Sequence, residues 1–263
     1  MRFHDSYKSY QEIYRVVIEK LQPRCLNYVM PNQKASSADR RQTIWVLGGG
    51  RFGQLAARRL RPLQPAAVIY VVEKRPQALS DIHEIAGIEV ISADAVEFIF
   101  HRLATMDVAD WIVPAVPVHV EYQWVLRSLS RTGTIIPLNL YERLRSQLFN
   151  PMQGTGVAIY TSIADFRCPD DCAEPADRCT ITGKSRPAVM FRHLQNLHVP
   201  GMAIRVIRSH QLAPGVGGYP VSALSETLVW AKAQNAPMLL ATACQCHGVL
   251  HAFQFHLHRS PGR

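Results

Sequence analysis

A glycine-rich stretch between an apolar segment and a helical pattern constrains the fold more than any other feature of the sequence. Residues 43–60 read TIWVLGGGRFGQLAARRL, with Gly48, Gly50 and Gly53 in G-x-G-x-x-G spacing. In a strand–loop–helix unit the first glycine permits a tight turn, the second lets the backbone approach a pyrophosphate, and the third lets the helix pack closely on the strand. The stretch therefore predicts a Rossmann-type unit with phosphates at the start of the helix.

Apolar runs and helical patterns continue to alternate after this unit. Further strands are expected in AVIYVVE, IEVISA, DWIVPAV and TIIPLNL, with helices between them. Continuous apolar strands separated by helices are typical of a parallel sheet covered on both faces. The predicted fold class is α/β, with a Rossmann-type doubly wound parallel sheet over residues 43–149. An N-terminal helix and linker (1–42) precede it, and a C-terminal α/β extension or small second domain (150–263) with a cysteine-rich loop follows.

Acidic residues follow the second and third predicted strands. Glu73 lies beyond Gly53 at about the distance from which a carboxylate accepts hydrogen bonds from ribose hydroxyls. Glu73 favours NAD over NADP because a carboxylate repels a 2′-phosphate, whereas the adjacent Lys74 and Arg75 weaken that preference. The sequence therefore does not decide between NAD and NADP. Asp94 is expected to cap the next helix, DAVEFIFHRLA.

Three of these features together resemble the TrkA N-terminal NAD-binding family, the nucleotide-sensing domains of potassium-uptake regulators. They are VLGGGRFGQLAARRL, Glu73 after the second strand, and SADAVE after the third, and the resemblance covers about residues 43–140. It implies a Rossmann fold and a bound dinucleotide, with an acidic turn near the adenine at Asp94. The residues implied in cofactor binding are Gly48, Gly50, Arg51, Phe52, Gly53, Glu73 and Asp94.

A cysteine-rich segment, CPDDCAEPADRCTITGKSRP (168–187), interrupts the second half of the chain. Cys168, Cys172 and Cys179 supply soft ligands suited to Zn²⁺ or an iron–sulfur cluster, either of which usually needs a fourth ligand. Cys244 and Cys246 lie two apart on a predicted strand and hence on one face, so one of them or a nearby histidine could complete the shell. A disulfide and unligated thiols are the alternatives to a metal centre.

Two histidines are the candidates for catalytic proton transfer, because imidazole titrates near neutral pH. His119 follows the fourth predicted strand, where Rossmann ligands approach the sheet; the alternative is a partly exposed histidine at a helix start. His210 precedes a second glycine-rich stretch, 215–218, expected between a strand and a helix. Free N–H groups there would suit a phosphate or carboxylate, so a small anionic ligand is expected.

Composition narrows the classes of partner. The net charge of +9 comes from dispersed Lys and Arg without a basic run, which favours small anionic ligands over nucleic acid. The first residues show no secretory-signal pattern, and residues 233–258 contain polar side chains that a membrane span would not tolerate. A cytoplasmic location and no membrane span are therefore expected, and a homodimer is left open.

The sequence as a whole predicts an NAD(P)-binding protein with a cysteine-ligated metal centre, a redox enzyme for a small anionic substrate. The main alternative is a non-catalytic nucleotide-sensing regulatory protein in which the metal is structural. A methyltransferase that uses the same loop for S-adenosylmethionine is a weaker alternative, because Gly53 and the helix after it fit a pyrophosphate better.

Overall fold

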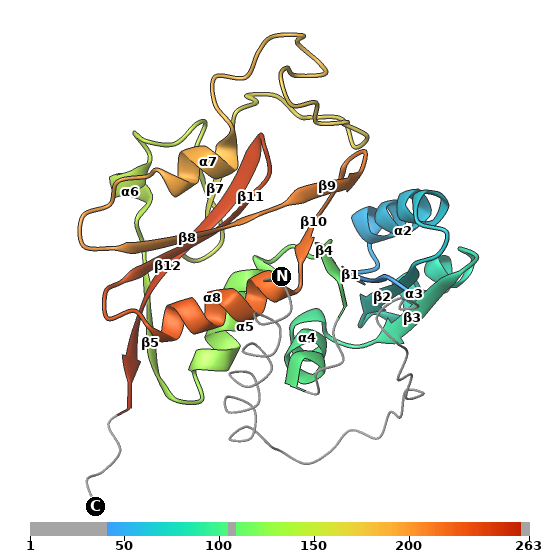
Figure 1. Cartoon of the computed structure of the whole chain (residues 1–263), viewed down its shortest axis with the longest axis horizontal. Coiled ribbons are helices and arrows are strands. Elements are labelled where there is room, and N and C mark those ends of the chain that lie inside the picture. The colour runs from blue at the N-terminus through green and yellow to red at the C-terminus, as the bar shows by residue number, and fades with distance from the viewer. Residues whose placement is uncertain (1–40, 105–108, 259–263) are drawn as a thin grey trace, which may run out of the picture.

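Two six-stranded sheets with helices between and around them form the protein (Figure 1). The computed structural model describes residues 41–104 and 109–258 of the 263-residue chain. The predicted N-terminal helix lies outside these residues, as does Cys25, the sixth cysteine of the chain. Within them, no helix is long and apolar enough to cross a bilayer.

The first sheet is the predicted parallel sheet, extended by two antiparallel strands. Its order is β3-β2-β1-β4-β10-β9, and the first four strands run parallel. The bounds are β1 (Thr43–Leu47), β2 (Val68–Glu73), β3 (Ile88–Ser92), β4 (Trp111–Pro114), β9 (His210–Ala213) and β10 (Val216–Pro220). The parallel ladder and the α2 and α4 crossovers confirm the mixed α/β class.

Helices cover both faces of this sheet. Ile44 and Val46 pack into a core with α2 (Arg51–Leu63) and α3 (Pro76–His83). The alternate residues Trp45 and Leu47 pack on the opposite face, where the helices are α4 (Ala95–Ala104), α5 (Val120–Leu129) and α8 (Ser222–Lys232). Two-faced burial explains why the strands read as continuous apolar runs rather than as an alternation.

The second sheet has the order β6-β7-β12-β11-β8, and β5 also pairs with β12. The bounds are β5 (Gly133–Leu138), β6 (Met152–Gln153), β7 (Ile159–Ser162), β8 (Ala203–Arg208), β11 (Met238–Ala243) and β12 (His247–Leu257). Short helices α6 (Tyr141–Leu144) and α7 (Met190–Gln195) pack on one face. Met238, Leu240 and Phe253 on the other face join the core of α5 and α8, so these helices lie between the sheets.

One strand prediction is wrong. TIIPLNL is predicted as a fifth strand of the parallel sheet, but β5 pairs antiparallel with β12, with Leu138 opposite Ala252. The position beside β4 belongs to β10, whose Tyr219 lies opposite Ile112. Only Gly133 of β5 is buried, so this strand lacks the two covered faces of a central parallel strand, and apolar composition alone did not reveal that.

Candidate functional site

Two glycines of the first loop are sterically required by the backbone around them. Gly48 has φ +106, a conformation that side chains disfavour, and its N–H donates to the Val72 carbonyl at 2.7 Å. A Cβ on Gly53 would lie 1.8 Å from the Gly48 carbonyl oxygen, which leaves no space for one. Gly50, in contrast, would meet only the Arg75 Nη2 at 3.3 Å, so its face is open.

A cavity of about 1140 Å³ lies over this loop and the carboxyl ends of the parallel strands. Ligand pockets in proteins typically measure about 300–1,000 Å³, so this cavity has room for a large ligand such as a dinucleotide. All but one of the predicted cofactor residues line it, namely Gly48, Gly50, Arg51, Phe52, Glu73 and Asp94. Gly53 lies beneath, at the contact between helix and loop.

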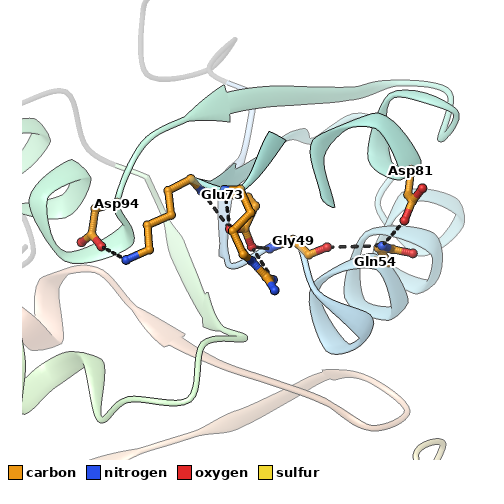
Figure 2. Close-up of polar contacts among 7 residues, drawn as sticks. Gly49, Gln54, Glu73, Asp81 and Asp94 are labelled. Carbon is orange, nitrogen blue, oxygen red and sulfur yellow. Dashed lines mark hydrogen bonds and ion pairs between the residues drawn. The ribbon is translucent and has the colours of Figure 1, made fainter. Parts of the chain in front are cut away.

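The Glu73 carboxylate is buried at the end of β2, with only 6% of the residue exposed (Figure 2). Its Oε2 accepts the Gly49 N–H at 2.8 Å, and its Oε1 accepts the N–H groups of Lys74 and Arg75. The Arg75 guanidinium donates to both oxygens, each at 3.1 Å. Hydrogen bonding to Arg75, aided by the backbone N–H groups, outweighs burial and lowers the pKa of Glu73 to about 2.

Asp94 caps α4 and faces the same cavity. Its Oδ1 accepts the N–H groups of Val96 at 3.0 Å and Glu97 at 3.3 Å, which is the N-cap arrangement. Its Oδ2 accepts a hydrogen bond from the Lys74 ammonium at 3.1 Å (Figure 2). Burial would raise the pKa of Asp94, but these hydrogen bonds hold it below its usual value.

A second cavity, of about 670 Å³, is lined by the cysteine segment, the β9–β10 hairpin and the turn between β11 and β12. Five cysteines line this cavity, namely Cys168, Cys172, Cys179, Cys244 and Cys246, and all five are free thiols. Phe52, 57% exposed at the start of α2, lines both cavities. The two cavities therefore adjoin at the first glycine loop, where Phe52 lies at the start of α2.

Backbone N–H groups approach two of the cysteine sulfurs. The Cys244 Sγ accepts from the N–H of Cys246 at 3.4 Å and of His247 at 3.3 Å. The N–H groups of Thr182 and Ile181 bond to Cys179 and lower the pKa of its thiol. Such N–H···S bonds stabilise thiolates and are a recurring feature of metal–thiolate sites.

Two further side chains contact the cysteines. The His247 ring lies between the sulfurs of Cys168 and Cys244, 3.7 Å from each, and the Arg186 Nε donates to the Cys246 Sγ at 2.8 Å. Burial raises the pKa of the Cys246 thiol, and Arg186 opposes that rise. In the described part of the chain, no three His, Cys, Asp or Glu side chains are arranged closely enough to hold a metal ion.

The cysteine segment lies beside the β9–β10 hairpin (Figure 1) and is hydrogen-bonded to this hairpin and to α2. The Arg51 guanidinium bonds to the Asp170 carboxylate, and Arg59 donates to the Asp170 carbonyl at 2.5 Å. The Gly215 N–H donates to the Cys172 carbonyl at 2.9 Å, and a Cβ on Gly215 would meet the Asp170 carbonyl oxygen at 1.6 Å. Residues distant in sequence therefore place the segment beside the first loop.

His119 does not face either cavity. It is the N-cap residue of α5, as the helix-start alternative predicted, but only 6% of the residue is exposed, so the predicted partial exposure is wrong. Its Nδ1 lies 3.0 Å from the Nδ1 of His251, and its Nε2 lies 2.9 Å from the Thr242 hydroxyl. Because Thr242 donates to Glu121 at 2.8 Å, it accepts from the His119 Nε2–H. Neither periodicity nor spacing in the sequence marked this buried network.

His210 lines the cysteine cavity, with its ring 5.6 Å from that of Trp111. Burial, followed by the nearby Arg208, lowers the pKa of His210. His210 is therefore the histidine of the two sequence candidates that can reach a ligand.

The second glycine stretch is a β-hairpin rather than the predicted strand-to-helix loop. Gly215, at φ +68, forms the turn between β9 and β10, and α8 begins only after β10 ends. Two arginines of the preceding strand β8 are engaged elsewhere: Arg205 pairs with Glu226 at 2.9 Å, and Arg208 lies over the Phe191 ring. The predicted anion site in this loop is therefore not assembled.

A comparison with known protein families agrees with the Rossmann-type unit in the first half of the chain. Residues 44–134 match the TrkA-N domain, which confirms the resemblance seen in the glycine loop and supports nucleotide binding there. The class is therefore a TrkA-N-type Rossmann domain joined to a second α/β sheet.

A second match defines the family. Residues 121–256, more than half of the chain, match a family described as "Uncharacterized protein, C-terminal domain", and the chain belongs to that family. It is also similar to a protein of Archaeoglobus fulgidus named "Uncharacterized protein", with 26% identity over 224 residues that span 80% of this chain and 98% of the relative. No solved structure matches the chain.

Proposed function

We propose that the protein binds NAD(P)(H) at the first glycine loop and uses an adjoining cysteine-ligated centre in redox chemistry on a small anionic substrate. The observation that carries the proposal is the junction of the two cavities at Phe52. In Rossmann domains the adenosine lies over β2 and the nicotinamide lies beyond β1, toward β4. Here β10 neighbours β4, and the hairpin turn before β10 lines the cysteine cavity.

The cysteine residues fit a soft metal or cluster by their chemistry. Several thiols that line one cavity, with N–H···S bonds to Cys179 and Cys244, form a donor set suited to Zn²⁺ or iron–sulfur ligation. Cys168, Cys172 and Cys179 would hold the metal, with Cys244, Cys246 or His247 completing the shell. A bound metal would supply Lewis-acid or electron-transfer chemistry, and the cysteine side chains would have to move closer together to ligate it.

The rest of the cavity offers groups for a substrate. Lys184, Arg167 and Arg186 line it and provide positive charge for a carboxylate or phosphate. His210 is the side chain that could hold or move a proton at its imidazole nitrogen, because its lowered pKa favours the neutral form at pH 7.

Metal analysis of protein produced and purified without oxygen tests the proposed centre. We expect about one zinc or one cluster per chain, with broad visible absorption for a cluster that bleaches on reduction. Cys172→Ser and Cys179→Ser should lose the metal, whereas Cys25→Ser, at a cysteine outside the predicted set, should retain it. Wild-type protein without iron or zinc at this level would contradict the metal centre.

A nucleotide-sensing protein without catalysis is the second candidate, and the TrkA-N match favours it. The link from Arg51 to Asp170 would then transmit dinucleotide binding to the cysteine segment. Oxidation of NAD(P)H by the metal-loaded protein with an added electron acceptor separates the two functions. Sustained turnover supports the redox enzyme, whereas binding without turnover supports the sensor.

A further inference from the structure

The acidic residue that should bind the ribose has no free acceptor. Oε1 of Glu73 already accepts hydrogen bonds from the N–H groups of Lys74 and Arg75 and from the Arg75 Nε. Oε2 accepts from the Gly49 N–H and from the Arg75 Nη2. A carboxylate offers about four lone-pair positions, so this one is saturated by the protein. The 2′-hydroxyl of an unphosphorylated ribose would have to displace one of these donors.

The unused groups at this end of the cavity are donors. The Arg75 side chain is 62% exposed and has five N–H groups, and among the described residues only its Nε and Nη2 make hydrogen bonds. The Lys74 side chain is also exposed, and its ammonium donates one hydrogen bond within the described residues, to Asp94. Figure 2 shows Asp94, the acceptor of the Lys74 ammonium, on the far side of Glu73 from Gln54.

The position of Arg75 places these donors beside the phosphate loop. Its Nη2 lies 3.3 Å from where a Cβ on Gly50 would stand, so the guanidinium lies over the open face of the loop. The negative charge of Glu73 is buried and neutralised by this same guanidinium. The surface presented to the ribose is therefore cationic and rich in N–H groups rather than acidic.

A hydroxyl and a phosphate make opposite demands on such a surface. The ribose 2′-hydroxyl needs an acceptor for its proton, whereas a 2′-phosphate carries only acceptors and negative charge, which an arginine accommodates. We infer that the site takes a 2′-phosphorylated dinucleotide, NADP(H), and that Arg75, assisted by Lys74, determines this specificity. The inference rests on the proposed dinucleotide site and reverses the preference for NAD that Glu73 alone suggests.

Titration of the wild-type protein with NADP⁺ and NAD⁺ tests the specificity without any variant. We expect NADP⁺ to bind at least about tenfold more tightly than NAD⁺, the factor that one charge-assisted hydrogen bond supplies. Adenosine 2′,5′-bisphosphate should exceed adenosine 5′-phosphate by a similar factor. Inorganic phosphate alone should bind far more weakly than either nucleotide, which places the recognition on the 2′-phosphorylated ribose.

Variants then test the residue assignment. Arg75→Gln should weaken NADP⁺ binding about ten- to hundredfold and should not weaken NAD⁺ binding, because Glu73 regains free acceptors. Lys74→Gln should cause a smaller loss of NADP⁺ affinity. The matched control is Arg145→Gln, since Arg145 is also exposed and paired with a glutamate, Glu142, but lines neither cavity.

These outcomes distinguish failure of the NADP(H) inference from failure of the proposed dinucleotide site. NAD⁺ affinity equal to or above that of NADP⁺ in the wild type overturns this inference and leaves the dinucleotide site standing. Retained discrimination in Arg75→Gln overturns the role of Arg75. If neither dinucleotide binds, the proposed function itself is wrong.

Discussion

The guanidinium of Arg51 donates a hydrogen bond to the carboxylate of Asp170, which joins the start of α2, after the first glycine loop, to the cysteine segment. Arg51 is the first residue of α2, where the pyrophosphate of a dinucleotide would lie, and Asp170 stands between Cys168 and Cys172. A bound dinucleotide and the Asp170 carboxylate would therefore both interact with the Arg51 guanidinium.

Asp170→Asn should raise dinucleotide affinity by about two- to tenfold, because it frees Arg51 and removes a negative charge beside the phosphates. Asp177→Asn is the matched control, since Asp177 belongs to the same segment but pairs with Arg178 and lines neither cavity. Calorimetric titration of both variants measures the effect. Equal affinities for the two variants and the wild type would show that the Arg51–Asp170 contact does not influence the nucleotide.

Two substitutions in the glycine loop should separate stability from binding. Gly53→Ala places a Cβ against the Gly48 carbonyl and should lower the free energy of unfolding by about 1–3 kcal/mol or more. Gly50→Ala meets only a flexible arginine tip and has an ordinary φ of −70°, so it should fold normally and bind dinucleotide more weakly. Urea denaturation together with titration checks both; equal stability losses would contradict the packing described here.

The buried imidazole pair predicts a loss of stability in mild acid. Burial, followed by the neighbouring His119, lowers the pKa of His251 to about 3, well below the unfolded value of about 6.5. The unfolded chain therefore binds the proton first, so this contribution is complete above about pH 6.5 and declines as the pH falls toward 3. We expect a loss of about 2 kcal/mol between pH 7 and pH 5.

The pH dependence of urea unfolding should be shallower in His251→Gln than in the wild type. His258→Gln is the control, because His258 is exposed near the end of the same strand. An identical slope for His251→Gln and the wild type would assign the acid sensitivity to other groups.

Thiol reactivity in the metal-free protein should follow the hydrogen bonds to sulfur. N–H groups lower the pKa of Cys179, whereas burial and the Glu174 carboxylate raise the pKa of Cys244. Since the thiolate is the nucleophile, iodoacetamide near pH 7.5 should modify Cys179 at least about tenfold faster than Cys244. Peptide mass spectrometry after timed quenching gives both rates; faster modification of Cys244 would contradict this order.

The sequence predicted well the features that depend on local periodicity. The glycine loop and the first four strands follow directly from apolar patterns and turn residues. The features it missed depend on partners distant in the chain. β5 lies in the second sheet because β12 covers its edge, and His119 is buried because Thr242 and His251 face it from that sheet.

In the site, too, the features set by local spacing could be predicted and those set by distant contacts could not. Gly48 and Gly53 could be assigned from spacing, since their roles lie within one strand–loop–helix unit. The saturation of Glu73 could not, because it depends on where the Arg75 side chain lies in space. Proximity of the cysteine segment to the first loop likewise arises from Arg51, Arg59 and the β9–β10 turn.

The central claim is that a dinucleotide binds at the first glycine loop. Its most direct test is calorimetric titration of the wild type and Gly50→Val with NADP⁺ and NAD⁺. A valine at this position would fill the open face of the loop where a pyrophosphate must approach. The account predicts saturable binding of at least one dinucleotide to the wild type, and its loss, by about a hundredfold or more, in a folded Gly50→Val variant. Unchanged dinucleotide affinity in Gly50→Val would contradict the site.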